Sequence, residues 1–247
     1  MTMLKAITFD FWMTLYRDTK TALEKRKRAR RRLMAEFLLG RGQPLSASER
    51  RRAWDHANAL FDEWWQRHHR SLTTEQRLRV VLDRLKIRHT PRELRRLSEA
   101  YGDFSRIAPP RPIGGVRETI PLLAERYRLA IICDTGITPG RVLRRILEQD
   151  GLLPYFRHCV FSDEVGRTKP HIDNFHLALR KLRAHPEESV HVGDLIRTDI
   201  RGAQGAGMHA LLFTGITKYS RRELQSEGRG VPVVSDFRKI PEVLKNL

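Results

Sequence analysis

The chain has 247 residues, of which 40% are hydrophobic, and this is enough to bury the core of one large domain or of two smaller ones. Its formal net charge of +18 at pH 7 raises the question of an anionic partner. Two cysteines without CxxC spacing exclude a disulfide-stapled scaffold and fit a reducing compartment. The sequence has no apolar run of membrane-spanning length and no signal-peptide pattern, so we expect a cytoplasmic protein with no membrane partner.

The first predicted strand covers residues 4–10, LKAITFD, and ends on Asp10. A helical pattern then extends from about residue 17 to 108, with repeated start signals in which Ser or Thr precedes Glu or Gln by three residues. These signals are SASE at 46–49, TTEQ at 73–76 and TPRE at 90–93. The pattern predicts helices over residues 18–39, 47–69, 74–87 and 91–104.

The segment IAPPRPIGG at 107–115 ends this helical region with three prolines and two glycines. Beyond it, short β-rich runs alternate with helical stretches, which is the pattern of parallel β-α units. The predicted strands cover residues 128–133, 159–161, 189–194, 209–214 and 231–235. We therefore predict an α/β fold with a parallel-sheet core formed by residues 1–16 and 110–247, into which residues 17–109 are inserted as an all-helical domain.

Polar side chains end several of these strands. Asp10, Cys133, Ser162 and Asp194 each stand at the carboxyl end of a predicted strand. Ligands of parallel α/β sheets bind beyond this edge, so we expect these residues to converge on one site.

Four segments at or just after these strand ends are FDFWMTL at 9–15, IICDTG at 131–136, TKP at 168–170 and VGDLIRTD at 192–199. In this order they resemble the four motifs of the haloacid dehalogenase-like hydrolase superfamily, and the helical insertion resembles its C1-type cap. The resemblance covers essentially the whole chain. It implies a Rossmann-like core, hydrolytic activity, and a small anionic, phosphorylated metabolite as the substrate.

The resemblance also implies roles for single residues. Asp10 would attack phosphorus and form an aspartyl-phosphate, which divides a difficult hydrolysis into two easier steps. Mg²⁺ would be bound by Asp10, Asp194 and the main-chain carbonyl of Trp12. Lys169 would neutralise both the nucleophile and the substrate. Asp199, five residues after Asp194, would orient Lys169 or a metal-bound water.

The transferred phosphoryl group would be held by donors from the first three motifs. Thr14, Thr135, Gly136 and Lys169 are the predicted substrate-binding residues, and Thr135 and Cys133 are included among the catalytic ones. Members of the superfamily commonly have Ser or Thr where Cys133 stands, and a thiol is the weaker donor.

Trp12 departs from the phosphatase pattern DxDxT, in which the second aspartate protonates the leaving group and later activates water. The indole N–H is a hydrogen-bond donor only, so position 12 lacks the general acid or base whose proton transfer contributes about 10² to 10⁴-fold in rate. The phosphatase interpretation then needs a leaving group of low pKa or an acid from elsewhere. The alternative is a 2-haloacid dehalogenase, since halide leaves without a proton, although VGDLIRTD is the metal-binding form of the fourth motif.

The basic charge is concentrated in the helical region, with EKRKRARRR at 24–32 as its densest run. Apolar residues are interleaved at helical spacing, so the favoured interpretation is a solvated helix face. Nucleic acid is a partner suggested by charge alone, because no recognition motif accompanies it. A third hypothesis is therefore a catalytically weakened protein whose basic cap binds a polyanion. The sequence leaves monomer and homodimer open.

Overall fold

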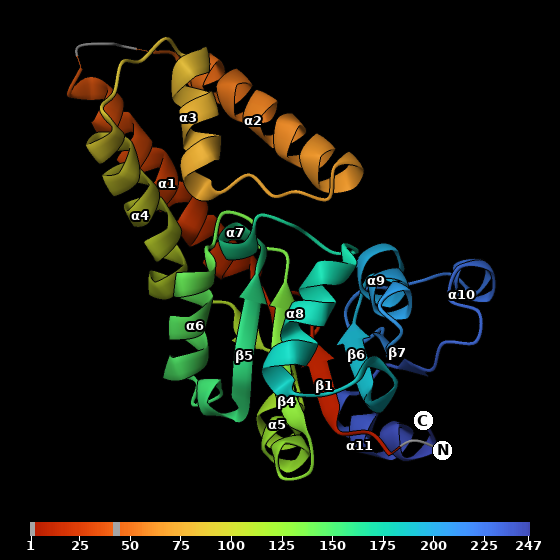
Figure 1. Ribbon diagram of the computed structural model, residues 1–247. Helices are drawn as coiled ribbons and strands as arrows, with labels where there is room; N and C mark the ends of the chain where they lie inside the picture. Colours follow the sequence, from red (N-terminus) through yellow and green to blue (C-terminus); the bar gives the residue numbers. More distant parts are fainter. Residues whose placement is uncertain (1–2, 42–44) are drawn as a thin grey trace. The chain divides into compact units, whose positions relative to one another are not determined.

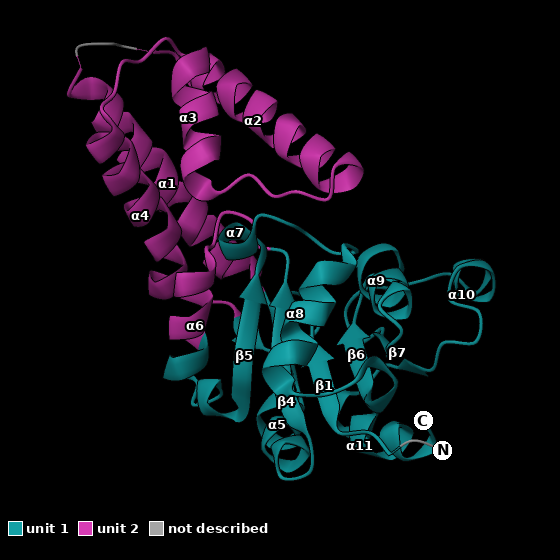
Figure 2. Cartoon of the chain, in the orientation of Figure 1, with its two compact units in different colours: residues 1–17, 111–134, 147–247 teal, residues 18–110, 135–146 magenta. Residues whose placement is uncertain are grey.

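The computed structural model describes residues 3–41 and 45–247, and the chain divides into two compact units (Figure 2). The core unit comprises Met1–Arg17, Arg111–Asp134 and Leu147–Leu247, and the helical unit comprises Asp18–Pro110 and Thr135–Ile146. The predicted boundaries after residues 16 and 109 each differ from these by one residue. The prediction assigned residues 135–146 to the core, whereas this segment groups with the helical unit.

Within the described residues, the core unit contains one parallel sheet of six strands in the order β5-β4-β1-β6-β7-β8 (Figure 1). This confirms the predicted α/β class with a parallel sheet. The strands are β1 (Ala6–Phe9), β4 (Arg128–Cys133), β5 (Phe156–Phe161), β6 (Ser189–Gly193), β7 (His209–Phe213) and β8 (Val233–Val234). A separate antiparallel pair joins β2 (Tyr16–Arg17) to β3 (Arg111–Pro112).

The central strand β1 is buried along its whole length because the sheet is covered on both faces. Ala6 packs with apolar residues of α8 (Ile172–Leu182) and α9 (Arg201–Gly205). Phe9 points to the opposite face, where its ring stacks on Phe237 with centroids 5.9 Å apart. Parallel pairing aligns Phe9 with Ile131 of β4 and with Val192 of β6, so the residues that follow these strands meet at one edge of the sheet.

The remaining elements of the core unit are short. They are α5 (Val116–Ala124), α7 (Ser162–Val165), α10 (Arg221–Ser226), α11 (Ile240–Val243), the π-helical turn η3 (Ile196–Ile200) and the 3₁₀ turns η1 (Leu153–Tyr155), η2 (Pro186–Glu188), η4 (Phe237–Lys239) and η5 (Leu244–Asn246). Helix α6 (Gly140–Gln149) begins in the helical unit and ends in the core unit. No helix in residues 3–41 and 45–247 has both the length and the apolar character needed to cross a bilayer.

The helical unit is built on α1 (Lys20–Leu39), α2 (Ala47–Arg67), α3 (Thr74–Arg84) and α4 (Pro91–Ile107), close to the predicted ranges. All three predicted capping boxes form. At α4, Thr90 Oγ1 accepts from the N–H of Glu93 at 3.2 Å, and the Glu93 carboxylate accepts from the N–H of Thr90 at 2.7 Å. Leucines and valines of α3 and α4 pack with Met34 and Leu38 of α1 in the core of this unit.

Candidate active site

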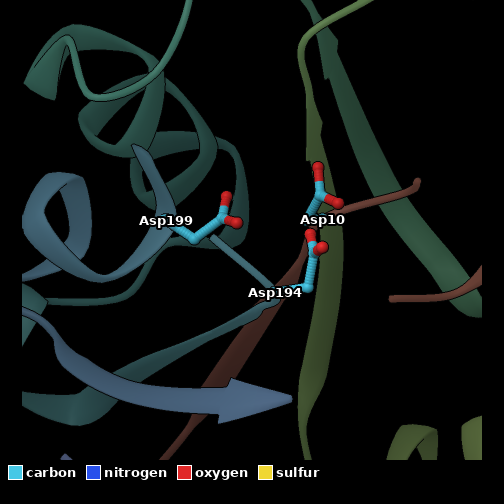
Figure 3. Close-up of side chains that lie close together, drawn as sticks. All are labelled: Asp10, Asp194 and Asp199. Carbon is cyan, nitrogen blue, oxygen red and sulfur yellow. The ribbon is translucent and has the colours of Figure 1, made fainter. Parts of the chain in front are cut away.

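Three aspartates meet at the carboxyl edge of the parallel sheet. Asp10 follows β1, Asp194 follows β6, and Asp199 lies in η3, which begins two residues after Asp194 (Figure 3). Each contributes a carboxylate oxygen to a group in which all the ligand atoms lie within 4.8 Å of one another, and all three residues are buried. The predicted convergence of Asp10 and Asp194 is therefore present in the core unit.

Lys169 provides the positive charge of this cluster. Its Nζ lies 2.5 Å from Asp10 Oδ1 and 2.7 Å from Asp199 Oδ1, and it also donates to the carbonyl of Ile132 at 2.9 Å. The side chain is 2% exposed, so these three acceptors take the place of water around the ammonium. The main-chain N–H of Lys169 donates to Asp134 Oδ1 at 2.9 Å, which fixes the backbone as well as the side chain.

Three buried carboxylates around one ammonium leave an excess of negative charge. Burial raises the pKa of the Asp194 carboxyl to about 7, and the charge of Asp199 adds to the effect. Burial also raises the pKa of Asp10, which the charge of Lys169 opposes. Burial works in the same direction on Asp199, but Lys169 and the hydrogen bond to His191 bring the pKa of Asp199 below its ordinary value. A hard divalent cation fits this donor set, because its charge offsets the repulsion and its preferred ligands are carboxylate oxygens.

Asp194 is held by two residues of the segment after β7. Thr217 donates a short hydrogen bond from Oγ1 to Asp194 Oδ2, and the hydroxyl of Tyr219 donates to the main-chain carbonyl of Asp194 at 2.8 Å. The Tyr219 oxygen accepts in turn from the N–H of Ile196 at 3.2 Å. Sequence reasoning missed both residues, since neither belongs to a motif and both lie more than twenty positions from Asp194.

His191 and Gly193 support Asp199 from β6. With the Asp199 carboxylate ionised, His191 donates from Nε2 to Asp199 Oδ1 at 3.3 Å and accepts at Nδ1 from the Thr8 hydroxyl at 2.8 Å. Burial lowers the pKa of His191, which agrees with a neutral ring. A Cβ on Gly193 would lie 2.3 Å from Asp199 Cγ, so a residue without a side chain is required here. The glycine of VGD therefore makes room for the carboxylate of Asp199.

A tight turn follows Asp10. The N–H groups of Leu15 and Tyr16 both donate to the carbonyl of Phe11, at 3.0 and 2.8 Å, and Met13 takes a positive φ of 60°. The half-buried indole of Trp12 lies edge-on to the Phe11 ring, with centroids 5.0 Å apart. Trp12 thus supplies the turn with an aromatic contact and no acid or base.

Two threonines near the cluster have buried hydroxyls. Within the part of the chain that the structure describes, Oγ1 of Thr14 and Oγ1 of Thr168 have no hydrogen-bond partner. Buried hydroxyls without partners are costly, so an anionic oxygen that accepts from them would be stabilised. Thr14 was predicted to bind substrate, whereas Thr168 was not singled out although it is the first residue of TKP.

The second motif is divided between the two units. Cys133 ends β4 in the core unit, and its burial raises the pKa of the thiol, which favours an S–H group over a thiolate nucleophile. Thr135 and Gly136 belong to the helical unit, where the Thr135 carbonyl accepts from the Ser71 hydroxyl at 3.0 Å. The residue between them, Asp134, was assigned no role from the sequence and binds the Lys169 backbone.

Comparison with known proteins gives a family match over residues 4–207, described as haloacid dehalogenase-like hydrolase. The Glyceraldehyde 3-phosphate phosphatase of Methanothermobacter thermautotrophicus is 30% identical over 249 residues, which cover 98% of this chain and 100% of that protein. The protein of the same name from Methanopyrus kandleri is 31% identical over 208 residues, with 83% and 82% covered.

Solved structures give the same fold. A 2-Haloacid Dehalogenase from Pseudomonas syringae pv. Tomato has a TM-score of 0.73 and 28% identity, with 99% of both chains covered. A HAD phosphatase from Thermococcus onnurineus has a TM-score of 0.64 with 98% of both chains covered, and at 20% identity it supports the fold alone. The sequence match and the fold together show that this chain is a hydrolase of the haloacid dehalogenase-like family.

Proposed function

We propose that the chain is a Mg²⁺-dependent phosphatase that acts on a small phosphorylated metabolite through an aspartyl-phosphate on Asp10. The observation that carries this proposal is the position of Asp10, whose carboxylate contacts Lys169 and shares a buried cluster with Asp194 and Asp199. A nucleophile next to a fixed ammonium, at the edge where substrates of parallel sheets bind, suits attack on an anionic group.

The steps assigned to the chain's own residues are attack, charge neutralisation and orientation. An Asp10 oxygen forms a bond to phosphorus while the bond from phosphorus to the ester oxygen breaks, and the leaving oxygen takes a proton from solvent water. A water oxygen then forms a bond to phosphorus while the bond from phosphorus to the Asp10 oxygen breaks, which releases inorganic phosphate and restores the carboxylate. Lys169 offsets the negative charge that gathers on Asp10 and on the phosphoryl oxygens. Asp199 holds the ammonium in place through its contact at 2.7 Å, while the hydroxyl of Thr14 and the thiol of Cys133 act as donors to the transferred group.

Asp10, Asp194 and the main-chain carbonyl of Trp12 would hold Mg²⁺. Once bound, this ion neutralises the paired anions of nucleophile and substrate, which otherwise repel each other. The raised pKa of Asp194 supports the assignment, since a carboxyl that burial makes hard to ionise gains most from a neighbouring cation.

The substrate class follows from the relatives and from Trp12. Relatives over nearly the full chain are named as phosphatases of glyceraldehyde 3-phosphate, so a triose phosphate is the first ester to test. Trp12 supplies no proton, which favours substrates whose leaving group needs none, such as an acyl phosphate. We further propose that the helical unit serves as the C1-type cap, with Thr135 and Gly136 as substrate-binding residues.

The test is phosphate release from glyceraldehyde 3-phosphate and from acetyl phosphate, each with Mg²⁺ and with EDTA. Turnover of at least one compound should require Mg²⁺ and vanish in Asp10→Asn. Glu125→Gln, the same carboxylate-to-amide change at an exposed position of the core unit, serves as the control and should leave turnover unchanged. Turnover that persists in Asp10→Asn would remove the proposed nucleophile.

A 2-haloacid dehalogenase is the second candidate. It is favoured by Trp12 at the position of the second aspartate and by the 28% identical Pseudomonas structure of that name. The carboxylate cluster argues against it, because the dehalogenases that resemble this fold work without metal. Halide release from 2-chloropropionate in EDTA, without phosphate release from either ester, would favour the dehalogenase over the phosphatase.

A further inference from the structure

The helical unit contains an open cavity whose lining residues have no part in the proposed catalysis. Its volume is about 690 Å³, which lies within the range of small-molecule sites, about 300 to 1,000 Å³. The cavity is lined by residues of α1, α2 and α4 together with Ile137. All of these residues belong to the helical unit, whose helices are magenta in Figure 2.

Cations dominate the lining of this cavity. Five of the lining residues are basic, namely Lys27, Arg30, Arg31, Arg50 and Arg51. Among the described residues that line the cavity, Asp55 is the single acidic one. Three of these basic residues come from the run EKRKRARRR, the densest positive segment of the sequence. The run therefore does more than form a solvated helix face, because part of it lines this open cavity.

The positive charge of the lining is only partly offset by carboxylates. Lys27 pairs with Glu24 at 3.0 Å, and Arg51 pairs with Asp55 at 3.8 Å. Within residues 3–41 and 45–247, the other three basic side chains form no ion pair with a carboxylate. An anion in the cavity would supply the missing charge at short range.

Arg30 is the buried member of the set. It is 8% exposed, and it donates from Nε to the carbonyl of Tyr101 at 3.0 Å and from Nη2 to the Ser105 hydroxyl at 3.2 Å. Its guanidinium also lies over the Tyr101 ring, 5.5 Å from the centroid. These contacts fix the guanidinium at the wall of the cavity, so part of the cost of ordering it for a ligand is met in advance.

The same wall carries an aromatic surface. Trp54 lines the cavity and stacks on Tyr101 with centroids 5.2 Å apart and an angle of 16° between the rings. Trp54 is half-buried, which leaves part of the indole accessible. Basic groups beside an accessible aromatic ring suit a ligand that has both phosphates and a flat ring.

We propose that this cavity is a second ligand site, formed by residues other than the catalytic carboxylates, which binds a nucleoside diphosphate or triphosphate. Arg30, Arg31, Arg50 and Arg51 contact the phosphates, and Trp54 contacts the base. The proposal does not rest on the proposed phosphatase function, because none of the residues that line the cavity is assigned a part in that reaction.

The experiment is calorimetric titration of the intact protein with ADP in EDTA. ADP should bind with one site per chain, and Arg31→Gln/Arg51→Gln should weaken it by about tenfold or more, as expected for lost hydrogen bonds to charged groups. Arg32→Gln/Arg52→Gln is the matched control, because it removes the next arginine of each helix, neither of which lines the cavity. Each double variant loses two charges and one i,i+4 ion pair, and the control should change the dissociation constant by less than about twofold.

Further arms separate the two parts of the ligand. Inorganic pyrophosphate and adenosine should each bind more weakly than ADP. ADP should also quench the tryptophan fluorescence of the wild type, and Trp54→Phe should remove this quenching. Pyrophosphate binding as tightly as ADP would overturn the nucleotide assignment. An equal loss of ADP affinity in both double variants would overturn the site itself, since it would show that the whole basic surface attracts the ligand.

Two remaining outcomes would also overturn the proposal. The first is that ADP does not bind saturably to a protein whose melting temperature shows it to be folded. The second is a rise in KM for the phosphate ester in Arg31→Gln/Arg51→Gln by the same factor as the ADP dissociation constant, which would assign the cavity to substrate binding. An inactive wild type would refute the proposed phosphatase function and leave the ADP titration interpretable.

Discussion

The hydroxyl of Tyr219 donates to the main-chain carbonyl of Asp194 at 2.8 Å, so the segment after β7 holds the residue that follows β6. Thr217 of the same segment donates to the carboxylate of Asp194. One contact fixes the backbone of this proposed metal ligand and the other fixes its side chain. Groups that orient a metal ligand in this way contribute to metal affinity without touching the metal.

Thr217→Val should therefore weaken metal binding. The variant keeps the shape of the side chain and removes the hydroxyl, so Asp194 loses its fixed rotamer and a hydrogen-bond donor that lowers the cost of its charge. We expect the dissociation constant for Mn²⁺, used as a spectroscopic substitute for Mg²⁺, to rise about 10- to 100-fold. Electron paramagnetic resonance of free Mn²⁺ during a titration measures this without any substrate.

Tyr219→Phe is a second test variant, and each test variant has a control in which the same substitution is made at an exposed position. Thr21→Val in α1 should leave the Mn²⁺ affinity unchanged. Tyr219→Phe should weaken it, whereas Tyr155→Phe, at a residue 36% exposed, should not. If all four variants bind Mn²⁺ equally well, the segment after β7 has no part in the metal site.

Lys169→Met should destabilise the metal-free protein strongly. The variant leaves Asp10 and Asp199 buried without their cation, and loss of one partner of a buried pair costs about 3–5 kcal/mol. Lys5→Met is the control. The Lys5 side chain is 49% exposed and pairs with Glu188, so the loss of this pair should cost less than about 1 kcal/mol. Urea unfolding in EDTA measures both. Adding Asp199→Asn to Lys169→Met should restore part of the lost stability, and no recovery would contradict the electrostatic explanation.

The elements of the fold were predicted best where one physical signal dominates. Residues 128–133 were predicted as a strand and β4 has the same bounds, because the run RLAIIC is apolar and buried along nearly all its length. The three capping boxes located the starts of α2, α3 and α4 by a local pattern that needs no tertiary contact.

The differences lie at the sheet edges and in the loops. The prediction of a strand over residues 159–161 was too short, because β5 is an edge strand whose first half carries the exposed Arg157 and the half-buried His158. The clustering of Asp10 with Asp194 followed from the rule for strand ends. The roles of Thr217, Tyr219 and Asp134 could not be predicted, since each depends on a contact between loops that no periodicity records.

The contribution of Asp194 to the stability of the metal-free protein should fall as the pH rises from about 4 to about 7. The pKa of Asp194 is raised from 3.8 to about 7 in the folded chain, so between these values the folded state keeps a proton that the unfolded state has released. The slope from this group is at most about 1.4 kcal/mol per pH unit. Asp194→Asn should remove this contribution in urea unfolding with EDTA, whereas Glu125→Gln should keep it. Parallel curves for wild type and Asp194→Asn would contradict the prediction.

Gly193→Ala should disrupt the site. Its Cβ would lie 2.3 Å from Cγ of Asp199 and 2.6 Å from Oδ2, so the carboxylate must leave the position in which it contacts Lys169. We expect a loss of stability of about 1–3 kcal/mol from overpacking and a loss of Mn²⁺ affinity. Gly114→Ala is the control, since no atom lies within 4 Å of the added Cβ and the backbone is not left-handed. Equal behaviour of the two variants in urea unfolding and metal titration would show that Asp199 has room to shift.

Trp12 should determine which leaving groups the enzyme accepts. Trp12→Asp introduces a carboxyl group where the related phosphatases have their second aspartate, and a positioned acid contributes about 10² to 10⁴-fold in rate. The gain should appear in kcat for glyceraldehyde 3-phosphate, whose alkoxide needs a proton, and hardly at all for acetyl phosphate, whose leaving carboxylate does not. Trp12→Phe keeps the aromatic contact with Phe11 and adds no acid, so the ratio of the two kcat values should stay as in the wild type. An unchanged ratio in a folded Trp12→Asp would mean that the proton comes from another residue, whereas an increase for both substrates alike would mean that the indole hinders binding and does not mark a missing acid.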